Sequence, residues 1–252
     1  MDVSISIDAK ELGKGAGNAA AQFIKEAIET NGTTSIIMAT GASQFETIHQ
    51  LTADKDIDWS KVTMFHLDEY IGLPVTHAAS FRKYLQERFL SKIPVLKHTY
   101  LINGAADAKK ECERLKDLIS QYKIDVALVG IGENGHLAFN DPPADFETEV
   151  PYIVVALDAS CRKQQFGEGW FNSIAEVPSH AISMSINQIL KSKNIICSVP
   201  DSRKAVAVKN TLEQQVSNLY PASILQLHAG CTVYLDKDSA EQLTIKNKFS
   251  QY

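Results

Sequence analysis

Short apolar runs alternate with longer segments of helical periodicity along most of this chain. Residues 3–7 alternate apolar and polar side chains with period two, which is typical of a half-buried or edge strand. Residues 35–39 and 125–129 are almost continuously apolar, the pattern of strands buried on both faces of a parallel sheet. The predicted strands are residues 3–7, 35–39, 62–67, 125–129, 152–157, 181–184, 194–199 and 231–235.

Segments with amphipathic helical spacing lie between these strands. In the first of them Phe23, Ile24 and Ile28 fall on one face, and Gly32 ends the helix. The alternation of strand and helix predicts an α/β fold, Rossmann-like, with a doubly wound, mostly parallel sheet and helices on both faces. The predicted helices are residues 11–30, 44–51, 78–89, 105–122, a helix after Lys204, residues 221–228 and a helical tail from Ser239 onward.

Length and composition favour one domain. A chain of 252 residues can enclose an ample core, and no repeat, low-complexity segment or linker interrupts it. We therefore expect a single domain over residues 1–252, with a mobile lid around residues 142–180. The polar stretch of residues 158–171 within that region is loose enough to serve as the lid.

The net charge and the spacing of the cysteines argue against several classes of protein. A net charge of −5 with scattered lysines argues against a nucleic-acid or membrane-surface partner. The four cysteines form no C-x-x-C pair, so neither a zinc site nor a redox motif is indicated. Reduced thiols and the absence of a signal peptide or a membrane-length apolar run predict a cytoplasmic protein.

The loop after the predicted strand 125–129 holds three glycines and a histidine. Gly130, Gly132 and Gly135 would permit positive φ and a close approach to a ligand, with His136 at the rim of a cleft. A tight turn with a structural histidine would explain the same residues. The G-x-G-x-x-G spacing also resembles a dinucleotide fingerprint, but prolines at 142 and 143 block the helix which that motif requires.

Three other strand ends carry polar groups. Thr40, Gly41, Ala42 and Ser43 precede a helix and could bind an anion through backbone N–H groups and hydroxyls, unless Ser43 is only an N-cap and Gly41 only a turn residue. Asp68 and Glu69 are costly side by side unless they are exposed or employed, so one is a candidate catalytic base and an exposed acidic turn is the alternative. Lys204, after the strand 194–199, could hold an anion.

Together these motifs resemble those of the glucosamine-6-phosphate deaminase (isomerase) family. The resemblance rests on residues 39–43, 65–73, 130–142, Lys204 and 223–228, which occur in the order of the family. It implies a sugar-phosphate isomerase type of fold and an enzyme of the hydrolase class acting in amino-sugar catabolism. The implied reaction converts glucosamine 6-phosphate to fructose 6-phosphate and ammonia, with no cofactor and no metal.

The resemblance also implies roles for single residues. Asp68 would move the C2 proton toward C1, and His136 would open the pyranose ring by moving a proton at the ring oxygen, chemistry that suits a carboxylate and an imidazole. Asn134 and Asp141 would flank and orient the histidine. The phosphate would be bound by Thr40, Gly41, Ala42, Ser43 and Lys204.

Residues 158–171 depart from the family pattern, in which an arginine of this region clamps the phosphate. We take Arg162 as its substitute, with Lys163 as the alternative, and the substrate could differ accordingly. Asn134 stands where some members have aspartate, and Asp141 stands where glutamate is common. Both are treated as tolerated variants.

Rival functions are a galactosamine-6-phosphate deaminase/isomerase, a 6-phosphogluconolactonase and a non-catalytic sugar-phosphate-binding regulator. The motifs do not separate the first from the main hypothesis. Leu137 and Tyr70 argue against the lactonase, and the presence of both Asp68 and His136 argues against a pure binding protein. The implied partner is a small amino-sugar phosphate, and the oligomeric state, including a homo-oligomer, is left open.

The basic residues that form an allosteric site in some hexameric members are absent around residues 151–155. We therefore expect no activation by N-acetylglucosamine 6-phosphate. Steady-state deaminase assays with and without this compound check the expectation, and a clear increase in rate would contradict it.

Overall fold

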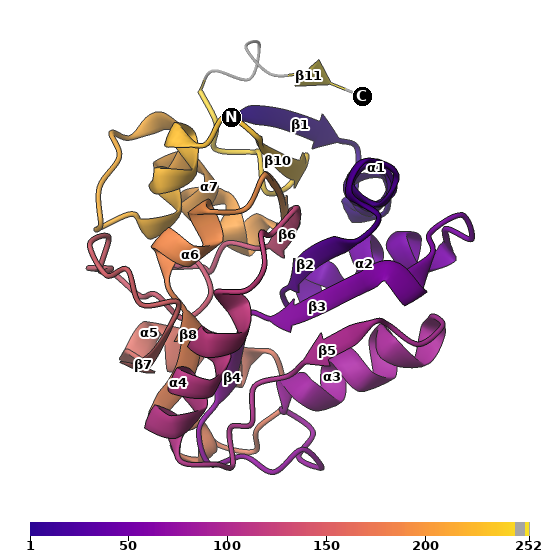
Figure 1. Ribbon diagram of the computed structural model, residues 1–252. Helices are drawn as coiled ribbons and strands as arrows, with labels where there is room; N and C mark the ends of the chain where they lie inside the picture. The colour runs from indigo at the N-terminus through magenta and orange to yellow at the C-terminus, as the bar shows by residue number, and fades with distance from the viewer. Residues whose placement is uncertain (245–249, 252) are drawn as a thin grey trace.

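A parallel sheet forms the centre of the computed structural model, which describes residues 1–244 and 250–251. Within these residues eight strands lie in the order β11, β1, β10, β9, β6, β2, β3, β5, and every neighbouring pair is parallel (Figure 1). The strands are β1 Asp2–Ser6, β2 Thr34–Met38, β3 Val62–His66, β5 His98–Tyr100, β6 Val126–Val129, β9 Asn194–Val199, β10 Cys231–Asp236 and β11 Ser250–Gln251.

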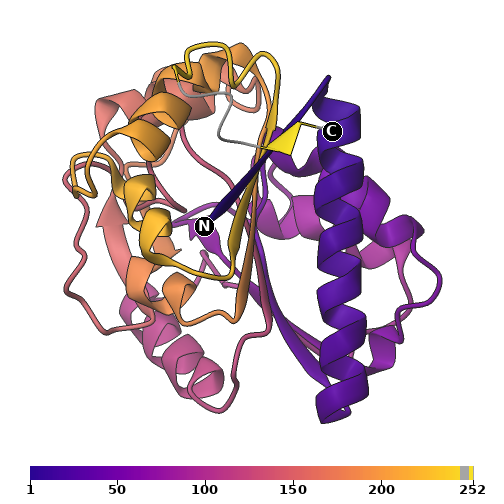
Figure 2. The ribbon, with the colours of Figure 1, turned by 90° about the horizontal axis from the view of Figure 1, so that it is seen from above.

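Helices cover both faces of the sheet because its central strands are apolar on both sides. In β6, Val126 and Leu128 pack with one core cluster, while Ala127 and Val129 pack with another on the opposite face. Figure 2 shows the sheet between α1 on one side and the orange C-terminal helices on the other. The first cluster includes α1 Ala9–Asn31, α2 Phe45–Ala53 and α3 Phe81–Arg88, and the second includes α4 Ala108–Ile119, α6 Ile186–Leu190 and α7 Ala205–Glu213.

The predicted doubly wound parallel fold is therefore confirmed. Among the described residues, no helix is long and apolar enough to cross a membrane.

A second, antiparallel sheet was not predicted. It consists of three strands in the order β4 Asp68–Tyr70, β8 His180–Met184 and β7 Tyr152–Ala156. The strands predicted at 152–157 and 181–184 exist, but they pair with each other and with β4 outside the parallel sheet. From Ile153 onward burial alternates along β7, with Val154 and Ala156 exposed and Ile153 and Val155 half-buried, as expected for a strand with one more exposed face.

The predicted secondary structure of two segments is wrong. Residues 158–171 are not irregular, because they contain the helix α5 Ala159–Gly167, whose N-terminus is capped by Asp158. The Asp158 carboxylate accepts a hydrogen bond of 2.6 Å from the backbone N–H of Cys161, which is buried. The helical tail from Ser239 is not found over residues 239–244, which form turns, and most of the rest lies outside the described residues.

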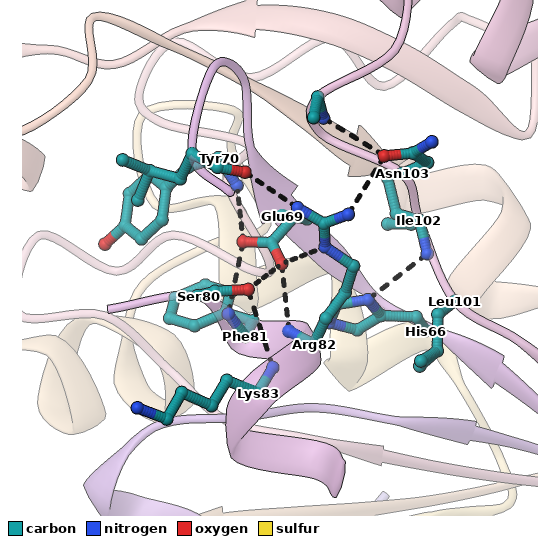
Figure 3. A network of polar contacts seen from close by, with 12 residues as sticks. His66, Glu69, Tyr70, Ser80, Phe81, Arg82, Lys83, Leu101, Ile102 and Asn103 are labelled. Atoms are coloured by element: carbon teal, nitrogen blue, oxygen red, sulfur yellow. Dashed lines mark hydrogen bonds and ion pairs between the residues drawn. The ribbon is translucent and has the colours of Figure 1, made fainter. Parts of the chain in front are cut away.

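Glu69 fastens β4 to the start of α3 (Figure 3). Its fully buried carboxylate accepts hydrogen bonds from the backbone N–H groups of Tyr70, Phe81 and Arg82 and from the Ser80 hydroxyl, at 2.9–3.1 Å. The Arg82 guanidinium adds an ion pair at 3.1 Å. The exposed acidic turn considered for Asp68 and Glu69 is therefore wrong, and Glu69 has a structural role.

We expect Glu69→Gln to lower the free energy of unfolding by about 3 kcal/mol, because it leaves the Arg82 charge buried without its partner. Urea unfolding measures the change. The matched control is Glu87→Gln, since the Glu87 side chain is 65% exposed and lies 3.9 Å from Lys83. The control should change stability by less than about 0.5 kcal/mol. Equal effects of the two substitutions would contradict the structural role of Glu69.

Candidate active site

The carboxyl ends of four neighbouring strands open into one cavity of about 400 Å³. The loop after β9 contributes Lys204, the loop after β6 contributes His136, and the residue two beyond the end of β3 is Asp68. The loop after β2 contributes Thr40, Gly41, Ala42 and Ser43. The parallel sheet thus brings together seven of the ten predicted site residues, which are far apart in the sequence.

The loop after β2 has the shape of a turn before a helix. Gly41 has φ +94°, a conformation that favours glycine, and it precedes the short 3₁₀ helix η1 Ala42–Gln44 that leads into α2. Neither helix start has a side-chain cap, so the interpretation of Ser43 as a mere N-cap is wrong. The Tyr84 hydroxyl donates a hydrogen bond of 2.9 Å to the Gly41 carbonyl and holds the turn.

Lys204 is a buried cation that lines the same cavity as this loop. It ends the 3₁₀ helix η5 Ser202–Lys204. Burial lowers its pKa, and the nearby carboxyl groups of Glu133 and Glu168 offset only part of that shift. Among the described residues, none accepts a hydrogen bond from its ammonium group. A buried and unpaired ammonium is costly, so this end of the cavity is suited to an anion.

His136 and Asp141 form a hydrogen-bonded dyad. His136 Nδ1 lies 3.0 Å from Asp141 Oδ1, and the Asn134 amide donates to the same oxygen at 2.9 Å. Because an ionised carboxylate can only accept, Nδ1 carries the proton and Nε2 of the neutral ring is left as a base. Burial acts to raise the pKa of Asp141, but its interactions with His136 and its hydrogen bonds from Asn134 and the Asp158 backbone outweigh burial and lower that pKa.

Two glycines of this loop have distinct uses. A Cβ on Gly132 would overlap the imidazole of His136, so only glycine allows the ring to lie against the loop. Gly135 has φ +86° and forms the turn before the histidine. The positive φ expected at Gly130 and Gly132 is wrong, because their backbones lie outside that region.

Asp68 presents a buried carboxyl group to the cavity. Burial raises its pKa to about 8, and the charges of Glu69 and Glu168 add to the effect. The group is therefore protonated at neutral pH in the unliganded protein. Such a strongly shifted carboxyl in a cleft is characteristic of catalytic sites.

A family model described as glucosamine-6-phosphate isomerases/6-phosphogluconolactonase matches residues 7–234. The chain belongs to this family. Two curated relatives, both named glucosamine-6-phosphate deaminase, cover 86% of this chain and 81% of their own length. The protein of Bacillus cereus (strain B4264) is 35% identical over 219 residues, and that of Bacillus thuringiensis (strain Al Hakam) is 36% identical over 219 residues.

Solved structures of this family have the same fold. A monomeric glucosamine-6-phosphate deaminase aligns with a TM-score of 0.85 and 33% identity, covering 96% of this chain and 99% of its own. The 6-phosphogluconolactonase from Trypanosoma brucei aligns with a TM-score of 0.77 over 96% and 98% of the two chains. At 18% identity the latter shows only a shared fold.

The helix α5 and its C-cap residue Glu168 form part of the cavity wall. Gln164 accepts a hydrogen bond of 2.8 Å from the Glu133 backbone, and Gln165 accepts one of 2.6 Å from the Tyr70 hydroxyl. Gln164, Gln165 and Glu168 line the cavity. Burial raises the pKa of Glu168, and Lys204 opposes the shift. None of these three residues was predicted, because a polar helix with few buried positions resembles a loop in sequence.

The predicted phosphate ligand Arg162 lies outside the cavity. Its guanidinium donates to the backbone carbonyls of Ile174 and Val177 at 2.9–3.2 Å and so supports the segment after α5. Lys163 does not line the cavity either, whereas Arg203, beside Lys204, does. The spacing of residues in a helix shows which side chains share its buried face. Because the sequence pattern did not predict α5 as a helix, it could not exclude Arg162 as a phosphate ligand.

One group of side chains within residues 1–244 has the donors of a metal site. Donor atoms of His136, Asp141 and Cys161 lie within 4.8 Å of one another. Burial raises the pKa of the Cys161 thiol, which disfavours the thiolate that binds metal ions, and the other two residues already bond to each other. We therefore interpret these residues as the His136–Asp141 dyad with a neighbouring buried thiol, and not as a metal site.

The raised pKa of Asp68 makes the free energy of unfolding depend on pH. A carboxyl group with pKa about 8 in the folded state and 3.8 when unfolded stabilises the fold fully only below pH 4. That contribution is lost as the pH rises toward 8. Each pKa unit is worth ~1.4 kcal/mol, so Asp68→Asn should be more stable than the wild type by roughly 2–4 kcal/mol at pH 7 and nearly equal to it at pH 4. Chemical unfolding of both proteins at the two pH values measures this, and a less stable variant at pH 7 would disprove it.

Proposed function

We propose that this protein catalyses the isomerising deamination of glucosamine 6-phosphate to fructose 6-phosphate and ammonia. The observation that carries the proposal is one cavity that joins a buried carboxyl group, Asp68, to a His136–Asp141 dyad and an anion-binding end at Lys204. The relatives and the solved structure named glucosamine-6-phosphate deaminase support it.

The reaction begins with binding and ring opening. The substrate's phosphate lies between Lys204 and the loop of Thr40, Gly41, Ala42 and Ser43. His136, with Nε2 unprotonated, takes the proton of the C1 hydroxyl and returns it to the ring oxygen, which opens the pyranose to an aldehyde. Asp141 stabilises the imidazolium that forms in between. Asn134 carries no charge and holds Asp141 in position through its amide.

Asp68 then moves a proton between two carbons. The substrate brings an ammonium group at C2, and a positive charge near Asp68 lowers its pKa, so that the bound carboxyl becomes a base. Asp68 takes the C2 proton while one proton of the ammonium group passes to the aldehyde oxygen, which gives a neutral enolamine. Asp68 then delivers its proton to C1, which leaves an iminium at C2. Water adds to that carbon and ammonia departs, giving fructose 6-phosphate. The buried position of Asp68 slows exchange of the carried proton with solvent.

We also propose that α5 belongs to the lid expected around residues 142–180, since its residues Gln164 and Gln165 line the cavity and accept hydrogen bonds from the Glu133 backbone and the Tyr70 hydroxyl. A cytoplasmic location, a single domain over residues 1–252 and any homo-oligomer stay predictions.

Ammonia release from the purified protein tests the proposal, with glucosamine 6-phosphate and galactosamine 6-phosphate as separate substrates. We expect release from the first, because the two sugars differ at C4 and the deaminase relatives are named for glucosamine. Asp68→Asn and His136→Gln should each lower kcat by about 10²–10⁴-fold.

Glu149→Gln is the matched control for these variants, because the Glu149 side chain is 75% exposed and lies outside the cavity. It should leave the rate unchanged. Absence of ammonia with both sugars, or an undiminished rate in Asp68→Asn, would refute the proposed function.

A further inference from the structure

The backbone at Asp201 adopts a conformation that normally requires glycine. Its φ of +88° and ψ of 134° lie in a region that L-residues rarely occupy. Within the described part of the chain only Ala138 and Asp201 combine positive φ with a side chain, and both line the cavity. Strained residues of this kind persist where the surroundings hold them and are concentrated at functional sites.

The surroundings of Asp201 hold it firmly. Its backbone N–H donates to both carboxylate oxygens of Asp236 at 3.1 and 3.3 Å, and Asp236 is only 4% exposed at the end of β10. The Ser239 N–H in turn donates to Asp236 at 2.7 Å. Glycine would give the same backbone path without strain, so what the strained residue adds is its carboxylate.

That carboxylate positions Arg203. Asp201 Oδ2 accepts hydrogen bonds from Arg203 Nε at 3.0 Å and from NH2 at 2.8 Å, while Oδ1 accepts from the Arg203 backbone N–H at 3.0 Å. Arg203 NH1 donates to Glu133 at 3.3 Å. A guanidinium has five N–H groups, so two donors stay available on a side chain that lines the cavity next to Lys204.

We propose that Arg203 is the second cation of the phosphate subsite and that Asp201 is a positioning residue that holds its guanidinium there. This inference rests on the proposed function and specifies how the substrate's phosphate is bound. Lys204 supplies a buried ammonium without a partner among the described residues, and Arg203 supplies a planar fork that matches phosphate oxygens. Arg162 and Lys163, the other basic residues considered, lie outside the cavity.

A purely structural role for the Asp201–Arg203 pair makes a different prediction. The Arg203 side chain is 49% exposed, and ion pairs so open to solvent contribute little to stability. If the pair only supported the loop, its removal would leave the affinity for phosphate unchanged.

The test measures binding of inorganic phosphate by calorimetry and the steady-state constants for glucosamine 6-phosphate. Arg203→Ala should weaken phosphate binding and raise KM by about 10- to 100-fold, the value of a charge-assisted bidentate contact, with kcat within about threefold. Arg203→Lys should recover only part of the affinity. Asp201→Gly should raise KM several-fold while the Tm stays equal or rises, because glycine accepts the positive φ without strain.

Lys163→Ala is the matched control, since this exposed lysine lies on α5 outside the cavity and its loss should change neither constant. Unchanged phosphate affinity and KM in Arg203→Ala would overturn the inference while ammonia release continued to support the proposed function. Phosphate titration needs no turnover, so weakened binding in Arg203→Ala would support the subsite even if the protein released no ammonia.

Discussion

Asp68 and Glu69 follow each other in β4, and a strand directs successive side chains to opposite faces. Glu69 therefore faces the start of α3, where backbone N–H groups and Arg82 bind it (Figure 3). Asp68 lines the cavity. The pair thus places a carboxylate with a structural role, Glu69, next to a carboxyl group that lines the cavity, Asp68. Burial and the neighbouring charges of Glu69 and Glu168 raise the pKa of Asp68 to about 8, so this carboxyl group is protonated at neutral pH.

The other groups of the site depend on the parallel sheet. Neighbouring parallel strands end at the same edge, so the loops after β2, β6 and β9 meet there although they lie far apart in the sequence. The same edge brings an acidic and a basic side chain, Asp68 and Lys204, into one cavity, and Glu168, which also lines it, acts electrostatically on both.

Much of this arrangement could be predicted from local patterns. The apolar runs at β2 and β6 identify buried strands, and their ends locate the loops with Thr40 and His136. The features that were not predicted from the sequence depend on contacts between distant segments. The partners of Glu69 lie in α3, the pairing of β4 with β8 joins residues over a hundred positions apart, and α5 exposes too many polar residues to show a helical stripe.

Arg162 and Arg203 illustrate the same limit at the level of single side chains. Both are arginines near predicted anion sites, but only the folded backbone decides which one lines the cavity. Asp201 gives no signal in sequence, because its combination of φ +88° and ψ 134° is one that side chains of any type rarely adopt.

In the proposed reaction one buried carboxyl group, Asp68, carries a proton from C2 to C1 of the sugar. Conversion of glucosamine 6-phosphate deuterated at C2 in ordinary water tests it most directly. The account predicts that part of the deuterium appears at C1 of fructose 6-phosphate, because a buried carboxyl exchanges slowly with solvent. Product with no deuterium at C1 would mean that the proton passes through water and would contradict the account.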